Sequence, residues 1–278
     1  MRTCFLCLLM VVLSACASIE RLALPKATPL PDTSLTRSAT PADKGVDHKD
    51  WTGFLSRYVA SDPQGVNRVA YGQVSSSDRE LLGHYLARMQ SVDPTRLTRD
   101  QQLAYWINLY NALTVELVLD NYPVDSIRDI KDGPFSIGPW NRPVARVGNQ
   151  TLTLNDIEHR IIRPTFNEPR IHYALNCAAV GCPNLIARAW QARTLNEDFA
   201  AAERAYVNDP RGVRFDDRGR LILSKIYIWF REDFGRDEQA VIGYLETAAE
   251  PELRRRLSQV TRVNSYAYDW ALNDATSP

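Results

Sequence analysis

The residues of this chain best suited to nucleophilic chemistry are two cysteines and two histidines close together in the sequence. Cys177 and Cys182 are five positions apart, and His172 precedes them. His159 lies further upstream, next to Glu158. A cysteine that a histidine keeps as thiolate attacks acyl carbons in hydrolases and acyl transferases. In this hypothesis Cys177 is the nucleophile, His159 is the base, and Glu158 orients the imidazole.

The expected backbone decides which histidine can serve Cys177. The segment Arg170–Asn176 alternates in the manner of a β-strand. Residues five apart on a strand point to opposite faces and lie about 16 Å apart, so His172 cannot form a simple dyad with Cys177. The distance from Cys177 to His159 depends on tertiary packing, and this pair is therefore the better candidate. His172 stays a secondary candidate for the site.

The two cysteines have three other interpretations, which stay open at this point. In an oxidising compartment, Cys177 and Cys182 can form a disulfide that closes a small loop. They can also be buried thiols that pack as small apolar groups. His159 and His172 would add ligands that suit zinc, but the short spacings typical of zinc sites are missing. We therefore predict no metal and no cofactor.

Glu158 has a structural interpretation beside the catalytic one. The segment Asn155–Arg163 has the pattern of a helix with a buried arc of isoleucines, and Glu158 projects inside that arc. A carboxylate on an apolar face must be paired, protonated or bonded to the backbone. Glu158 can meet this need by accepting from the first N–H of its own helix. His159 can likewise be a histidine at the edge of the core.

The longest predicted element is a helix over Arg99–Asn121, which ends before Pro123. Its stretch Leu103–Leu119 contains a single charge and has apolar residues on opposite sides. We therefore expect a central, largely buried helix. Asn108 and Asn111 on this helix must find hydrogen-bond partners, and both can tie a loop to the core. The functional alternative is that Asn111 orients a reactive side chain.

Other local signals predict short helices and hairpins. The segments Ser77–Glu80, Thr98–Gln101 and Thr194–Glu197 have capping-box spacing at helix starts. Gly148-Asn149 and Asp217–Gly219 each separate two short β-like segments, as in a hairpin. Helices cluster around hairpins and do not alternate regularly with parallel strands. The predicted fold class is therefore α+β, as a single domain.

The start of the chain has the pattern of a bacterial lipoprotein signal. An apolar run ends in Leu13-Ser14-Ala15, with small residues directly before Cys16. The run is too short to span a bilayer. Residues 1–15 are predicted to be a signal peptide, and Cys16 the lipidated first residue of the mature protein. Lipoproteins kept at the inner membrane usually have Asp after this cysteine, so Ala17 predicts the periplasmic face of the outer membrane.

The remaining chain divides into a tether and a globular part. Residues 16–45 carry four prolines among Thr, Ser and Ala, which predicts a flexible tether. Residues 46–278 contain no second linker and are expected to form one domain. The full chain has 33 basic and 33 acidic residues, and loss of the signal removes one basic residue. A chain near neutrality has no electrostatic reason to bind nucleic acid. The expected partners are the membrane, through Cys16, and an envelope protein or small substrate.

Five motifs lie in order along the chain, at Tyr105–Leu113, Leu154–His159, Arg170–Pro183, Leu223–Phe234 and Tyr268–Asn273. Together they resemble the domain of unknown function 547 (DUF547) family. The resemblance implies membership of the family but no activity, because the chemistry of the family is unestablished.

Two functions from different classes remain open on the sequence. In the first, the domain is a membrane-tethered periplasmic binding or assembly module, and Cys177 and Cys182 are structural. In the second, it is a thiol-dependent hydrolase or acyl transferase that acts on peptide-like or acyl substrates. The enzyme requires Cys177 and His159 within about 4 Å in a cleft. We favour the module, because each catalytic candidate has an adequate structural explanation.

Overall fold

The structure is a computed structural model that describes residues 24–38, 45–133 and 136–275. The predicted signal peptide, Cys16 and Ala17 lie outside the described residues. The chain divides into two compact units. The larger unit consists of Ala27–Phe199 and Asp269–Pro278, and the smaller unit of Met1–Lys26 and Ala200–Tyr268.

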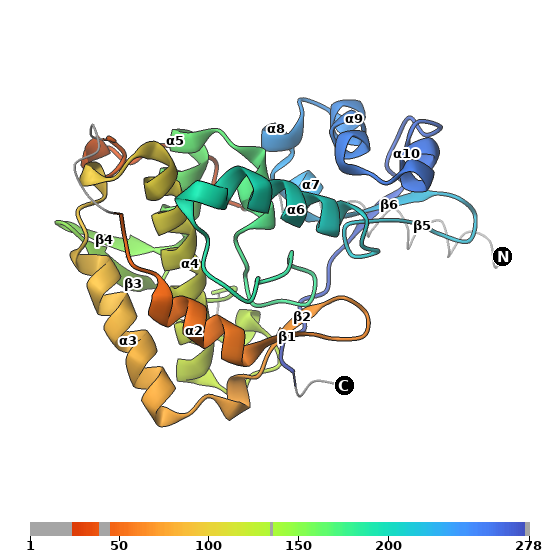
Figure 1. Ribbon diagram of the computed structural model, residues 1–278. Helices are drawn as coiled ribbons and strands as arrows, with labels where there is room; N and C mark the ends of the chain where they lie inside the picture. The colour runs from red at the N-terminus through yellow and green to blue at the C-terminus, as the bar shows by residue number, and fades with distance from the viewer. Residues whose placement is uncertain (1–23, 39–44, 134–135, 276–278) are drawn as a thin grey trace. The chain divides into compact units, whose positions relative to one another are not determined.

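The larger unit contains most of the helices and two small hairpins (Figure 1). Its α-helices are α2 (Lys49–Tyr58), α3 (Ser76–Ser91), α4 (Arg99–Asn121) and α5 (Arg163–Phe166). Its strands are β1 (Val59–Ser61), β2 (Asn67–Val69), β3 (Pro143–Val147) and β4 (Gln150–Thr153). Short 3₁₀ helices are η1 (Thr33–Leu35), η2 (Tyr71–Gln73), η3 (Pro94–Arg96), η4 (Ile127–Asp129), η6 (Pro169–Tyr173) and η7 (Ala192–Thr194). The segment η5 (Asp156–Ile162) is a π-helix.

Helix α4 is the central, buried helix that the sequence predicts. Thr98 and Gln101 form the predicted capping box at its start, each bonding the other's backbone N–H. Nearly every residue from Gln102 to Leu119 is buried. Helix α3 packs against both α4 and β3, and α2 packs against α3. A helix covered on all sides can carry apolar residues all round, which explains why α4 has no polar face.

The start of α3 differs from the prediction by two residues. The capping residue is Ser75, not Ser77, and its hydroxyl accepts from the N–H of Asp78 (3.1 Å). The Ser75 hydroxyl also donates to the Asp78 carboxylate (2.9 Å). Asp78 therefore takes the place that we assigned to Glu80. Three consecutive serines at 75–77 offer equivalent caps, and local spacing cannot choose among them.

The hairpin predicted around Gly148-Asn149 is confirmed. Strands β3 and β4 pair antiparallel, with Val147 opposite Gln150. Gly148 has φ +56°, a left-handed conformation that glycine adopts without a steric penalty. Strands β1 and β2 form a second antiparallel hairpin in this unit.

The strand predicted over Arg170–Asn176 is wrong. Residues Pro169–Tyr173 form the 3₁₀ helix η6, and the carboxylate of Glu168 accepts from the N–H of Arg170 at its start. Proline at the first position and an acidic cap both favour a helical turn. Ile171, His172 and Tyr173 are all buried, so the alternation of polar and apolar residues carried no information about two faces. Our argument that His172 and Cys177 lie on opposite faces of a strand fails with it.

The smaller unit combines one small sheet with short helices. Strand β5 (Val213–Phe215) pairs antiparallel with β6 (Leu221–Ser224), which confirms the second predicted hairpin. Strand β7 (Ser265–Ala267) then pairs parallel with β6. The helices are α7 (Ile226–Trp229), α8 (Arg231–Phe234), α9 (Glu238–Ala248) and α10 (Pro251–Leu257). Helix α6 (Leu195–Val207) begins in the larger unit, directly after Thr194 as predicted.

The predicted α+β class is confirmed, with a long buried helix, surrounding helices and short hairpins. Among the residues described, no helix is long and apolar enough to cross a bilayer. The division of residues 46–278 into one domain stays a prediction.

Candidate functional site

Glu158, His159 and His172 meet in one buried cluster of the larger unit. Oε1 of Glu158 lies 3.8 Å from Nδ1 of His172 and 3.9 Å from Nδ1 of His159. Nη1 of Arg163 lies 3.3 Å from Nδ1 of His159. The two imidazoles are at most 3% exposed and the Glu158 side chain is 11% exposed. The cluster thus brings one carboxylate, two imidazoles and one guanidinium together in the core, where polar groups need partners.

The π-helix η5 brings Glu158 and His159 into the core together. We predicted a helix over Asn155–Arg163, and the structure has η5 followed directly by α5. A π-helix has more residues per turn than an α-helix, so its buried arc includes more consecutive positions. Five of its seven residues are buried: Ile157, Glu158, His159, Ile161 and Ile162. The sequence signals a helix here but does not distinguish the π form.

Cys177 and Cys182 form a disulfide in this structure, with a Cα–Cα distance of 6.3 Å. The N–H of Cys177 also donates to Sγ of Cys182 (3.0 Å). Cys182 is buried, whereas Cys177 is partly exposed. A sulfur bonded to sulfur is not a thiolate, so Cys177 holds no nucleophile in this state.

Both candidate asparagines bind backbone at their two ends. Nδ2 of Asn111 donates to the carbonyl of Ala174, and its Oδ1 accepts from the N–H of Asn176, both at 2.9 Å. Asn108 does the same to one residue, Trp190, with distances of 2.9 and 3.0 Å. Each amide thus satisfies a backbone N–H and a backbone carbonyl inside the core. Helix α4 holds two loops in this way, one of which leads directly into the disulfide.

A buried amide network that we did not predict surrounds the disulfide loop. Asn176 donates to the carbonyl of Pro183 (2.8 Å) and accepts from the N–H of Ala178 (2.9 Å). The backbone of Asn273 donates to the carbonyl of Ala178 (3.1 Å). Ala178 itself has φ +58°, a conformation that non-glycine residues rarely adopt. Local sequence does not reveal the pairing of residues so far apart in the chain.

The C-terminal segment covers this loop. The carbonyls of Asp269 and Ala271 accept from the N–H groups of Gly181 (2.9 Å) and Val180 (2.8 Å). Trp270 packs edge-on against Trp140, with ring centroids 5.7 Å apart. The ring of Trp270 therefore holds the C-terminal segment against the larger unit.

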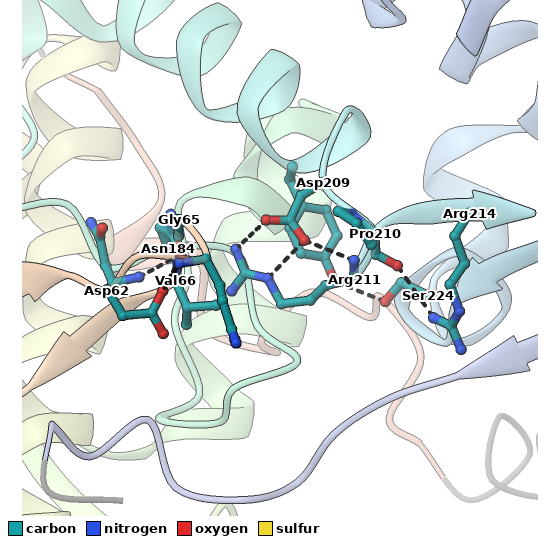
Figure 2. Close-up of polar contacts among 12 residues, drawn as sticks. Asp62, Gly65, Val66, Asn184, Asp209, Pro210, Arg211, Arg214 and Ser224 are labelled. Carbon is teal, nitrogen blue, oxygen red and sulfur yellow. Dashed lines mark hydrogen bonds and ion pairs between the residues drawn. The ribbon is translucent and has the colours of Figure 1, made fainter. Parts of the chain in front are cut away.

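The segment just after the disulfide is hydrogen-bonded to the turn between β1 and β2 (Figure 2). Nδ2 of Asn184 donates to the carbonyl of Gly65 (2.9 Å). Within the turn, the carboxylate of Asp62 accepts from the N–H of Val66 (3.0 Å). The residues near Cys177 thus serve mainly to hold backbone segments in place.

Two cavities open on the larger unit. One has a volume of about 370 Å³ and lies at the starts of α4 and α6, beside α5 and η6. The other has about 480 Å³ and lies between residues 45–47, α3 and η3. Neither is lined by Glu158, His159, His172 or Cys177. Within the described part of the chain, no group of three or more His, Cys, Asp or Glu residues is arranged to hold a metal ion.

The comparisons with known proteins identify a family and nothing more specific. The model described as "Protein of unknown function, DUF547" matches residues 94–207. This range contains the motifs at 105–113, 154–159 and 170–183, whereas those at 223–234 and 268–273 lie outside it. No curated protein and no solved structure matches the chain. Over residues 94–207, the chain is similar to the DUF547 family.

Proposed function

We propose that this protein is a binding or assembly module, tethered by lipid on Cys16 to the periplasmic face of the outer membrane. The disulfide between Cys177 and Cys182 carries the proposal, because it removes the only nucleophile that the enzyme hypothesis names. A disulfide is also typical of proteins outside the reducing cytosol. The competing function is a Cys177–His159 hydrolase or acyl transferase.

The other catalytic candidates support the module. Asn108 and Asn111 use both ends of their amides on buried backbone groups. Glu158, His159 and His172 are buried together with Arg163. A catalytic base needs access to a substrate proton. These groups therefore act as structural partners of one another, while the open cavities offer the binding surfaces.

Alkylation separates the module from the enzyme. The full chain is expressed in a Gram-negative bacterium, treated with iodoacetamide without reductant, and digested for peptide mass analysis. We expect no labelling of Cys177 or Cys182 until the protein is reduced or unfolded. Rapid labelling of Cys177 below about pH 7, slowed by His159→Ala, would show an activated thiolate and favour the hydrolase.

Lipid anchoring is tested by membrane fractionation of the same cells. Cys16→Ser removes the thioether site, so the protein should move from the membrane fraction to the soluble fraction, because no acyl chains remain to hold it. Ala17→Asp is the matched variant and should move the protein from the outer to the inner membrane. Retention of Cys16→Ser in the outer membrane would contradict the anchor.

A further inference from the structure

We propose that the cavity at the starts of α4 and α6 binds a small zwitterionic, peptide-like ligand that carries one carboxylate and one ammonium group. This inference rests on the proposed binding function and names its ligand class. A volume of about 370 Å³ is in the range of small-molecule sites. All residues that line the cavity fall between Arg99 and Phe199, inside the segment that the family model matches.

Two arginines at the cavity have donors to offer to a carboxylate. Arg193 is exposed and, within the described residues, makes no hydrogen bond or ion pair. Arg99 stacks on Phe166, with its guanidinium carbon 5.0 Å from the ring centroid. One terminal nitrogen of Arg99 donates to the carbonyls of Thr165 and Phe166, so its position is held without a neutralising carboxylate. A guanidinium fixed in this way is suited to paired hydrogen bonds with a carboxylate.

The third arginine of the cavity is already neutralised. Arg170 forms a two-point ion pair with Glu168, at 2.8 and 2.7 Å, and donates to Asn196 (2.9 Å). Burial opposes ionisation of Glu168, but the hydrogen bonds from Arg170 outweigh it and lower the pKa of Glu168. Arg170 also lies over the ring of Phe199, at 5.3 Å. The Arg170–Glu168 ion pair therefore lines the cavity without adding a net charge to it.

Two further carboxylates of the cavity lack a cationic partner. Asp100 and Glu197 lie in the first turns of α4 and α6, are exposed, and make no ion pair with any described residue. Each helix start stabilises a negative charge, and both carboxylates can accept from an ammonium group. A ligand with only negative charge would meet these carboxylates as well as the arginines. Since like charges brought together cost free energy, the lining favours a ligand with both signs.

The floor of the cavity is apolar, so the ligand should also carry an apolar group. Leu103, Phe166, Leu195 and Phe199 are nearly buried and contribute to the lining. Arginines that already stack on two of these rings keep the charged groups beside the apolar surface. A dipeptide with one large apolar side chain combines the two charges with a group that can cover this floor.

The test uses three dipeptide probes and the full-length protein in detergent. Binding of Ala-Phe, N-acetyl-Ala-Phe and Ala-Phe amide is measured from chemical-shift changes in ¹H–¹⁵N spectra. Ala-Phe should bind at least threefold more tightly than either blocked form, with shifts at residues 99–103 and 193–199. Equal binding of the acetylated form, or absence of binding up to about 10 mM of Ala-Phe, would overturn the inference.

Variants test which side chains bind the carboxylate of the ligand and which bind its ammonium group. Arg193→Gln should weaken binding of Ala-Phe about tenfold, as expected for loss of one charge-assisted hydrogen bond. Arg146→Gln, on the exposed side of β3 and outside the cavity, is the matched control and should leave binding unchanged. The pair Asp100→Asn with Glu197→Gln should remove the preference for the free amine. If Arg146→Gln weakens binding as much as Arg193→Gln, the inference is wrong.

Failure of this inference and failure of the proposed function are distinguishable. If no dipeptide binds while Cys177 stays unlabelled without reductant, the ligand class is wrong and the module stands. If Cys177 is labelled rapidly, the module is wrong whatever the dipeptides do.

Discussion

Asn111→Ala is expected to lower the free energy of unfolding by about 4 kcal/mol, because it leaves two buried backbone groups unpaired, each at a cost of about 1–3 kcal/mol. The groups are the carbonyl of Ala174 and the N–H of Asn176, which Asn111 binds at 2.9 Å. Asn111, Ala174 and Asn176 are at most 4% exposed, so bulk water does not reach these groups. The loss is measured by urea denaturation of the wild type and the variant, followed by tryptophan fluorescence.

Asn121→Ala is the matched control on the same helix. Its amide binds the carbonyl of Leu117 one turn earlier in α4 (2.8 Å), and it is only partly buried. Loss of that bond should cost less than about 1 kcal/mol. If both variants lowered the free energy of unfolding equally, the proposed role of Asn111 in holding the two buried backbone groups would be refuted. Because Asn111 holds the segment leading to Cys177, only its replacement should also increase hydrogen exchange at the N–H groups of residues 176–178.

Protonation of His48 should by itself lower the free energy of unfolding by about 3 kcal/mol as the pH drops from about 6.5 to about 4. The cause is His48, 6% exposed, whose Nδ1 lies 2.8 Å from the hydroxyl of Tyr85. Burial lowers the pKa of His48 to about 4, and the nearby charge of Asp47 opposes this only in part. Burial also raises the pKa of Tyr85, so its hydroxyl stays protonated.

The direction of this pH dependence follows from the number of protons that the folded and the unfolded state bind. In the unfolded chain His48 has an ordinary pKa near 6.5, whereas in the folded protein it stays neutral until about pH 4. Between these values the unfolded state binds more protons, and stability therefore rises with pH. The contribution is complete above about pH 6.5 and is lost by about pH 4.

Urea denaturation at several pH values measures this effect in the wild type and in His48→Asn. The variant should lose the part of the pH dependence that lies between pH 4 and 6.5. His84→Gln, a change of an exposed histidine on α3, is the control and should keep it. An NMR titration that places the imidazole of His48 near pH 6.5 in the folded wild type would contradict the prediction without any variant.

The sequence by itself determined the elements whose cause is local. The capping box at Thr98, the left-handed turn at Gly148 and the long apolar run of α4 each depend on residues within a few positions of one another. Such interactions form in the same way wherever the segment lies in the fold. The resemblance to the DUF547 family can also be seen in the sequence alone, because its motifs are continuous stretches of residues.

Tertiary structure decided the elements and sites whose cause is distant. Residues 169–173 form a 3₁₀ helix rather than a strand, and because Ile171, His172 and Tyr173 are all buried, the alternation of polar and apolar residues does not mark two faces there. The burial of His48 depends on Tyr85 on another helix, and nothing beside it in the sequence indicates this. The cavity combines Arg99 with Arg193, whose approach depends on how α4 and the loop before α6 pack. Local residue types determine which hydrogen bonds a segment can make, but only packing determines which groups lose water and which charges meet.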